Sequence, residues 1–375
     1  MQIEQESTPE LEDINYLQNQ LEEIHKDVYR NVDKETFRES LNKSLSVSKE
    51  FLPIAIQESL ALIGDAHTLV PGLVTANYLP ICTTEIDGKF YITGSTKDHE
   101  GLIGEEILAI NRHHLKEILP QISKLSSKEN SETLLRDLEN YLISSRILRY
   151  YGFGDKDKFS LTTKNREVDI QVNPKEKLHL RKPLRWNVDK TEHPTYYGND
   201  IYQFRKEKGI LIFQYNSCTN EGHTDQELQE FKYKLLDQID KSEKIIVDLR
   251  QNSGGDTEVM GDLFNKFPDD KELYVAMSRT TFSSGIHHLL YLKKNKGGIL
   301  IGENAGQKPN RFGDHKVIHL PNSKLRVNCS YKYFELLPGE DIDVIKPDIP
   351  IPVTINDYIN NTDPLDKWIN KGLIY

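Results

Sequence analysis

The segment TTFSSG, residues 280–285, places a serine hydroxyl between an expected strand and an expected helix. A serine in such a turn can act as an exposed nucleophile, and the start of the helix favours developing negative charge. Serine is also a common N-cap residue, so Ser283 and Ser284 could simply cap the helix that begins near Ile286. The segment alone therefore supports either a nucleophile or a cap.

The segment DLRQNSGG, residues 248–255, ends an apolar strand in a glycine pair. In α/β proteins the carboxyl ends of strands are where ligands bind. Glycine lets the backbone approach a ligand closely, so Gly254 and Gly255 could donate N–H groups to an oxyanion. A tight turn between strand and helix explains the same residues.

Two further segments carry groups that could move a proton. In GDAHT, residues 64–68, His67 could be a general base whose ring is oriented by a hydrogen bond. The chain has 12 histidines, and most histidines are structural. Lys308 lies in the glycine-bounded segment 302–314, and lysines in loops are usually solvated.

The elements that must position these segments alternate between strand and helix in the C-terminal half. Alternating strands and helices predict a mostly parallel α/β sheet. The expected strands are 209–215, 244–250, 273–278 and 298–303, and the expected helices are 225–240, 257–267 and 286–294.

The N-terminal half is expected to be helical and then mixed. Apolar residues at three- and four-residue steps predict helices within 10–63, and Gly64 and Asp65 end them, which places His67 in a turn. A region of mixed strands and helices follows. In this region we expect strands at 90–94 and 105–111, helices within 113–124 and 129–148, and a hairpin of 158–163 with 167–172. A Lys-, Arg- and Pro-rich connector is expected after it, at 174–195.

Composition excludes several classes of protein. The net charge of −10, without a basic block, argues against a nucleic-acid partner. The three cysteines form no CxxC pair, so neither a zinc site nor a disulfide framework is expected. No apolar run approaches a membrane span, and the first residues do not resemble a signal peptide. We expect a soluble chain, cytoplasmic as written, or extracytoplasmic if a leader has been removed.

The order of the motifs resembles that of the tail-specific (C-terminal processing) protease family, which includes the tricorn core and the repeats of interphotoreceptor retinoid-binding protein. DLRQNSGG, TFSSG, GENAGQKPNRFG and KPDIPIPVT occur in the family's order, and the resemblance covers roughly residues 200–355. It implies a crotonase-like α/β core in 181–375. The GDAHT segment resembles the DGHT segment of the family's histidine-using branch.

The resemblance extends more loosely to the middle of the chain. LIGEEILAIN, residues 102–111, resembles a stretch of the PDZ domain that these enzymes often insert. The family pattern therefore implies a helical N-terminal region at 1–70 and a degenerate PDZ-like domain at 71–180.

Matching positions also imply roles within a serine peptidase. Ser283 matches the nucleophile, and the N–H of Ser284 would pair with that of Gly255 or Gly254 as the oxyanion hole. One branch of the family uses a loop lysine as base, and Lys308 stands 25 positions after Ser283.

The other branch uses the histidine that His67 matches. We favour His67, because a histidine needs no burial to be neutral near pH 7 whereas a lysine does. A carboxylate completes the site in this branch. Within GEDIDVIKPD, Asp341 is the choice, with Asp343 and Glu340 as alternatives.

Departures from the family pattern leave two alternatives open. Ile286 stands where a glutamate usually follows the nucleophile, and Asn304 and Ala305 replace the usual Pro-Thr pair. The alternatives to a peptidase acting on peptide or protein substrates are an inactive peptide- or hydrophobe-binding protein on the same scaffold and an acyl-CoA enzyme. No metal or cofactor is implied, and the oligomeric state is left open.

Overall fold

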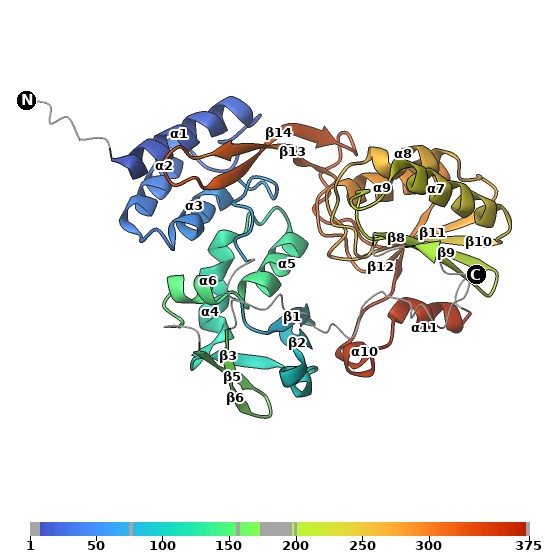
Figure 1. The fold of residues 1–375 in the computed structure, drawn as a ribbon, viewed down its shortest axis with the longest axis horizontal. Helices are drawn as coiled ribbons and strands as arrows, with labels where there is room; N and C mark the ends of the chain where they lie inside the picture. The colour runs from blue at the N-terminus through green and yellow to red at the C-terminus, as the bar shows by residue number, and fades with distance from the viewer. Residues whose placement is uncertain (1–7, 75–77, 155–157, 173–196, 199–200, 373–375) are drawn as a thin grey trace, which may run out of the picture. The chain divides into compact units, whose positions relative to one another are not determined.

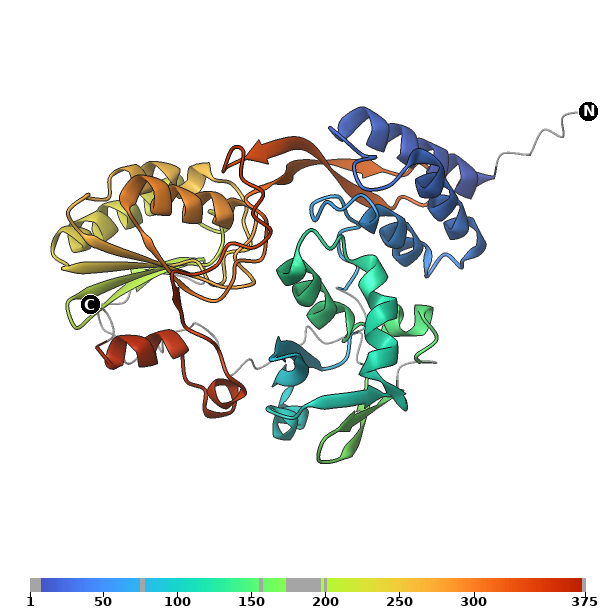
Figure 2. The same cartoon turned by 180° about the vertical axis from the view of Figure 1, so that it is seen from behind.

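The computed structural model of the chain describes residues 8–74, 78–154, 158–172, 197–198 and 201–372 (Figure 1 and, from behind, Figure 2). The expected connector 174–195 lies outside them. The chain divides into two compact units. We call Met1–Pro183 with Asn310–Glu335 the helical unit, and Leu184–Pro309 with Leu336–Tyr375 the sheet unit.

Three helices open the helical unit, as expected from the periodicity. The side chains of Thr8 and Asp33 accept hydrogen bonds from Leu11 N and Thr36 N, which satisfies backbone N–H groups that a helix start leaves unpaired. The apolar faces of these helices are buried in one core. They are α1 (Pro9–Ile24), α2 (Lys34–Lys43) and α3 (Leu52–Ala61), with a short 3-10 turn, η1 (Ser44–Ser46), after α2.

The expected strands and helices of the middle region are also present. The strands form one antiparallel pair and one four-stranded sheet of order β4-β3-β5-β6. The pair is β1 (Ile81–Ile86) with β2 (Lys89–Ser95), and the sheet holds β3 (Ile107–Ile110), β4 (His113–His114), β5 (Lys158–Thr163) and β6 (Glu167–Gln171). The helices are α4 (Leu115–Ile122), α5 (Ser131–Tyr141) and α6 (Ser145–Tyr150), with 3-10 turns η2 (Lys97–Leu102) and η3 (Ser123–Leu125).

A long hairpin from late in the sequence completes the helical unit. Strands β13 (Asn310–His319) and β14 (Arg326–Glu335) pair antiparallel. Ile318 and Val327 of this hairpin are buried in the same core as the helices α1 to α3. The sequence pattern did not predict this hairpin, because charged residues interrupt its alternation.

The sheet unit contains a seven-stranded sheet of order β15-β12-β11-β10-β9-β8-β7. In this sheet the strands β9, β10, β11, β12 and β15 run parallel to one another. Strand β8 pairs antiparallel with β9, and β7 pairs antiparallel with β8. The strands are β7 (Tyr197–Gly198), β8 (Tyr202–Glu207), β9 (Ile210–Tyr215), β10 (Lys244–Asp248), β11 (Glu272–Met277), β12 (Ile299–Gly302) and β15 (Ile349–Pro350). The expected mostly parallel α/β sheet is thus confirmed.

Helices cover both faces of this sheet, as Figure 1 shows. On one face lie α7 (Asp225–Asp240), α8 (Glu258–Asn265) and α9 (Ser284–Lys296), packed on strand residues such as Phe213 and Val247. On the other face Trp368 of α11 (Pro364–Asn370) packs edge-on against Tyr274, with ring centroids 5.5 Å apart. A further helix, α10 (Ile355–Asn360), precedes α11. Within the described ranges, no helix combines the length and apolarity that crossing a bilayer requires.

Trp368 should contribute strongly to the packing of α11 on the sheet. We expect Trp368→Ala to lower the free energy of unfolding by roughly 3–5 kcal/mol, because it empties a buried aromatic site. Urea unfolding followed by circular dichroism measures this. Tyr233→Ala is the control, since 76% of that side chain is exposed and its loss should change little. Equal effects of both substitutions would contradict the packing described.

Candidate active site

Ser283 occupies a strained position at the start of α9. Its backbone has φ of 52° and ψ of −120°, a region that non-glycine residues rarely adopt and that clusters at functional sites. The N–H of Ser283 donates to the buried Oε1 of Gln307 at 2.9 Å. Among the described residues, no capping hydrogen bond joins the Ser283 side chain to α9. The turn therefore presents this serine in a way that capping does not explain.

Gly254 lies directly against the serine. A Cβ atom built on Gly254 would stand 2.5 Å from the Cβ of Ser283 and 3.1 Å from its Oγ. The φ of Gly254 is also +104°, where L side chains are strained. Only glycine therefore lets the DLRQNSGG turn reach the Ser283 turn this closely.

Asn252 fixes the conformation of the DLRQNSGG turn. Its fully buried side chain donates from Nδ2 to Tyr215 O at 3.0 Å and accepts from Gly254 N at 3.0 Å through Oδ1. Its main-chain oxygen accepts from Phe282 N at 2.9 Å. One residue thus joins the end of β9, the glycine turn and the residue before Ser283.

Two backbone N–H groups beside Ser283 have no acceptor within the part of the chain that the structure describes. They belong to Gly255 and Ser284. Gly255 forms a parallel bridge with Cys218, and Ser284 donates from its Oγ to Gly255 O at 2.5 Å. The N–H of Gly254, in contrast, is already bonded to Asn252. Donors of this kind can stabilise a developing oxyanion.

His67 lies in the helical unit, in a turn after α3 as expected from the sequence. Its N–H donates to Asp65 Oδ1 at 2.9 Å. Asp65 is buried and also accepts from His25 Nε2 at 3.3 Å and from Thr68 Oγ1. Ser330 N of β14 donates to Thr68 Oγ1 at 3.0 Å, so the hairpin anchors this turn.

The surroundings of His67 keep its imidazole neutral. Burial is the largest cause that lowers the pKa of His67; Asp65 opposes it, the charges of Arg311 and Arg136 add to it, and the result is a pKa of about 4. Burial alone would raise the pKa of Asp65, but the hydrogen bonds from His25 and Thr68 hold it below its ordinary value. A neutral imidazole next to a carboxylate can accept a proton.

Lys308 and the candidate carboxylates lie in the sheet unit. Lys308 Nζ forms an ion pair with Asp343 Oδ1 at 3.0 Å. Asp341 and Glu340 are exposed on the same loop. For Asp341 the described residues supply no hydrogen-bond or ionic partner to its side chain.

The sheet unit therefore brings Ser283, Ser284, Gly254 and Gly255 together, whereas His67 belongs to the other unit. Sequence reasoning did not single out Asn252 and Gln307. Both lie inside segments that it did single out, one before the glycine pair and one next to Lys308. Their buried side chains bond to backbone groups of the two turns, which no spacing in the sequence reveals.

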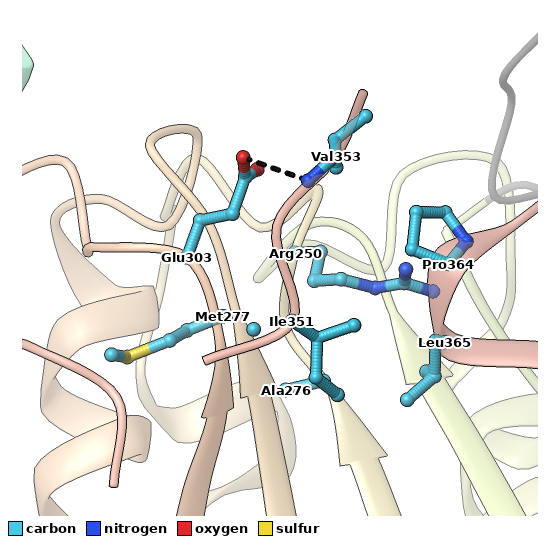
Figure 3. Close-up of a pocket in the computed structure, with 9 residues that line it drawn as sticks. Arg250, Ala276, Met277, Glu303, Ile351, Val353, Pro364 and Leu365 are labelled. Carbon is cyan, nitrogen blue, oxygen red and sulfur yellow. Dashed lines mark hydrogen bonds between the residues drawn. The ribbon is translucent and has the colours of Figure 1, made fainter. Parts of the chain in front are cut away.

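Part of the carboxyl edge of the sheet is closed. Arg250 is buried and bonds both Asp248, at 2.7 and 2.9 Å, and Asp363, at 2.7 and 2.9 Å. Beside it lies a cavity of about 10 Å³, lined also by Glu303, whose Oε1 accepts from Val353 N at 3.4 Å (Figure 3). Such a cavity holds no more than about one water molecule, so a substrate cannot bind there.

Three groups of the helical unit could offer ligand atoms to a cation. Ligand atoms of Asp65, His67 and Glu129 all lie within 4.8 Å of one another. Both oxygens of Asp65 already accept hydrogen bonds, and the buried Arg311 interacts electrostatically with His67 and Glu129. The positive guanidinium of Arg311 beside these residues disfavours a divalent cation. The cluster therefore fits a site of proton transfer better than a metal site.

The low pKa of His67 makes the stability of the protein depend on pH. In the unfolded chain His67 takes up a proton near pH 6.5, and in the folded chain only near 4. Its contribution to stability is therefore complete above pH 6.5 and is lost as the pH falls towards 4. Relative to His67→Gln, the wild type should become less stable over this window in urea unfolding. Parallel pH dependences of the two proteins would contradict the assignment.

Comparisons with known proteins show the fold. No family model and no curated protein matches this sequence. Among solved structures, mature CPAF complexed with lactacystin is 13% identical over 97% of both chains, with a TM-score of 0.67. A serine-to-alanine mutant of CPAF is 14% identical over 97% of this chain and 96% of its own, with the same TM-score.

A protein from Parabacteroides merdae, proposed to be a peptidase, is 12% identical over 98% of both chains, with a TM-score of 0.51. At such identities the likeness shows the architecture alone. The chain therefore has the fold of these proteins, and its resemblance to the tail-specific protease family is confirmed at the level of the fold.

Proposed function

We propose that the protein is a serine peptidase that hydrolyses peptide bonds of peptide or protein substrates through an acyl-enzyme on Ser283. The observation that carries the proposal is the strained Ser283 turn, set against Gly254 and beside two backbone N–H groups for which the described residues supply no acceptor. Strain of this kind persists only where surrounding contacts hold it. The fold shared with a protein proposed to be a peptidase supports the same function.

The reaction would proceed by two acyl transfers. Ser283 Oγ attacks the carbonyl carbon of the substrate while its proton passes to His67. The N–H groups of Gly255 and Ser284 bind the oxyanion, and each such donor is typically worth about 3 kcal/mol. His67 returns the proton to the leaving amine. A water molecule, deprotonated by His67, then hydrolyses the acyl-enzyme and frees Ser283.

Several contacts support these assignments over their alternatives. Gly255 is the better oxyanion donor, because the N–H of Gly254 is bonded to Asn252. Lys308 Nζ is engaged in an ion pair with Asp343 Oδ1 at 3.0 Å, which makes it a poorer candidate for the base than His67. His67 is therefore our proposed base. Asp341 stays the proposed acidic residue, since its carboxylate is not committed to Lys308.

The finer family features stay predictions of the sequence. These are the crotonase-like character of the core, the PDZ-like character of the middle region and the three-part division at residues 70 and 180. The antiparallel strands and helices of the middle region are compatible with a PDZ-like domain.

A fluorophosphonate probe tests the nucleophile directly, because it forms a bond only with an activated serine. We expect the folded wild type to be labelled and Ser283→Ala to lose all labelling. Ser253→Ala, an exposed serine of the neighbouring turn, is the matched control and should label normally. A folded wild type that takes up no probe would favour a peptide-binding protein without activity. Loss of labelling in Lys308→Gln but not in His67→Gln would assign the base to Lys308.

Gln307 should act as a positioning residue for Ser283. Gln307→Ala removes the acceptor of the Ser283 N–H, and a shift of the hydroxyl by about 1 Å can cost about 10²-fold in rate. We expect the labelling rate to fall by roughly this factor. Gln307→Glu keeps an oxygen at this position and should restore most of the rate. If both variants lose activity equally, or neither does, the hydrogen bond has no role in positioning.

A further inference from the structure

Helices α8 and α9 of the sheet unit wall a groove with a volume of about 500 Å³. Its inner surface includes Phe264 of α8, Leu290 of α9, and Leu336 and Leu337, which follow β14. Small-molecule pockets in proteins commonly measure about 300–1,000 Å³, so the groove has ample room for a substrate side chain. We call this feature the α8–α9 groove.

The groove begins next to the proposed catalytic turns. Thr257 lines it and stands two residues after Gly255. His287 also lines it, and its N–H bonds Ser283 O at 3.4 Å within the first turn of α9. Four residues of helix rise by about 6 Å, so this end of the groove lies about one helical turn from Ser283.

The wall of the groove is apolar in part. Leu336 and Leu337 are half-buried, whereas Phe264 is fully buried and Leu290 is nearly so. The ring of His288 packs against those of Phe264 and Tyr215, at centroid distances of 4.9 and 5.8 Å. Among the described residues its Nε2 has no hydrogen-bond partner, and burial lowers its pKa to about 4, so the ring is uncharged near pH 7.

Gly261 leaves space in the α8 wall. It lines the groove, and a Cβ atom built there would meet no atom within 4 Å. Its backbone is helical, so a larger residue is not strained at this position. Glycine lowers helix stability relative to most residues, and its presence in the middle of α8 therefore has no local explanation. The space in front of Gly261 is available to a bound group.

We propose that the α8–α9 groove binds a large apolar side chain of the substrate, such as leucine, methionine or phenylalanine, at a residue flanking the scissile bond. The assignment rests on the proposed peptidase function of Ser283. The continuity of the groove with the Gly255 and Ser283 turns selects a substrate side chain as its occupant. Glu258, Asp262 and Lys294 at the edge are exposed and charged, so the apolar occupant must be confined to the interior.

Filling the groove from Gly261 tests the proposal. Gly261→Phe places a ring in the open space, and Gly261→Ala adds one methyl group. Neither substitution lowers helix propensity, and urea unfolding verifies that each variant is folded. Gln229→Phe, on the exposed face of α7, is the matched control for an added aromatic ring.

The first measurement maps cleavage sites in unfolded β-casein by mass spectrometry. We expect the wild type and Gln229→Phe to cut beside large apolar residues. Gly261→Phe should lower such cuts at least tenfold relative to cuts beside alanine, glycine and serine, and Gly261→Ala should lower them less. An unchanged distribution in Gly261→Phe, with normal fluorophosphonate labelling, overturns the groove assignment and leaves the peptidase proposal standing.

The second measurement does not need catalysis. In the Ser283→Ala background, fluorescence polarisation compares labelled Gly-Gly-Leu-Leu-Gly-Gly with the same peptide carrying two alanines. Tighter binding of the leucine peptide, weakened at least tenfold by Gly261→Phe, supports the groove even if the wild type neither labels nor cleaves. Equal binding of both peptides with and without Gly261→Phe overturns it.

Discussion

The proposed site depends on one buried amide, the side chain of Asn252. Its Nδ2 donates to Tyr215 O at the end of β9, and its Oδ1 accepts from Gly254 N in the glycine turn. The main-chain oxygen of the same residue accepts from Phe282 N, the residue before Ser283. The Sγ of Cys218 also contacts the Oδ1 of Asn252 at 3.3 Å. An apolar side chain of similar size would leave Tyr215 O and Gly254 N buried and unpaired, at a cost of about 1–3 kcal/mol each. Asn252 therefore connects three segments of the chain: the end of β9, the glycine turn and the turn that holds Ser283.

The strained backbone conformation of Ser283 is held in place by contacts with neighbouring residues. Gln307 accepts its N–H from one side, and Gly254 lies against its side chain from the other. The parallel strands β10 and β11 bring the two turns to the same edge of the sheet. A serine held in this way would need no reorganisation before acting as the proposed nucleophile, which is the main advantage of a rigid scaffold.

The elements of the sheet unit could be predicted because a parallel sheet covered on both faces produces long apolar runs, such as 244–250 and 273–278. The rule that ligands bind at carboxyl ends of strands then placed the two turns together. The roles of Asn252 and Gln307 could not be predicted, because each bonds to backbone groups that only the fold brings near. The pairing of Lys308 with Asp343 depends in the same way on loop geometry.

The β13–β14 hairpin imposes an order on biosynthesis. The core of α1 to α3 is completed by Ile318 and Val327, and the His67 turn is tied to the hairpin through Ser330 N and through the paired backbones of Leu69 and Asn328. A nascent chain that has just left the ribosome with its first 300 residues has none of these partners. The helical unit can therefore mature only after most of the sheet unit has been translated, so a translation product that ends before the hairpin does not carry a finished His67 turn.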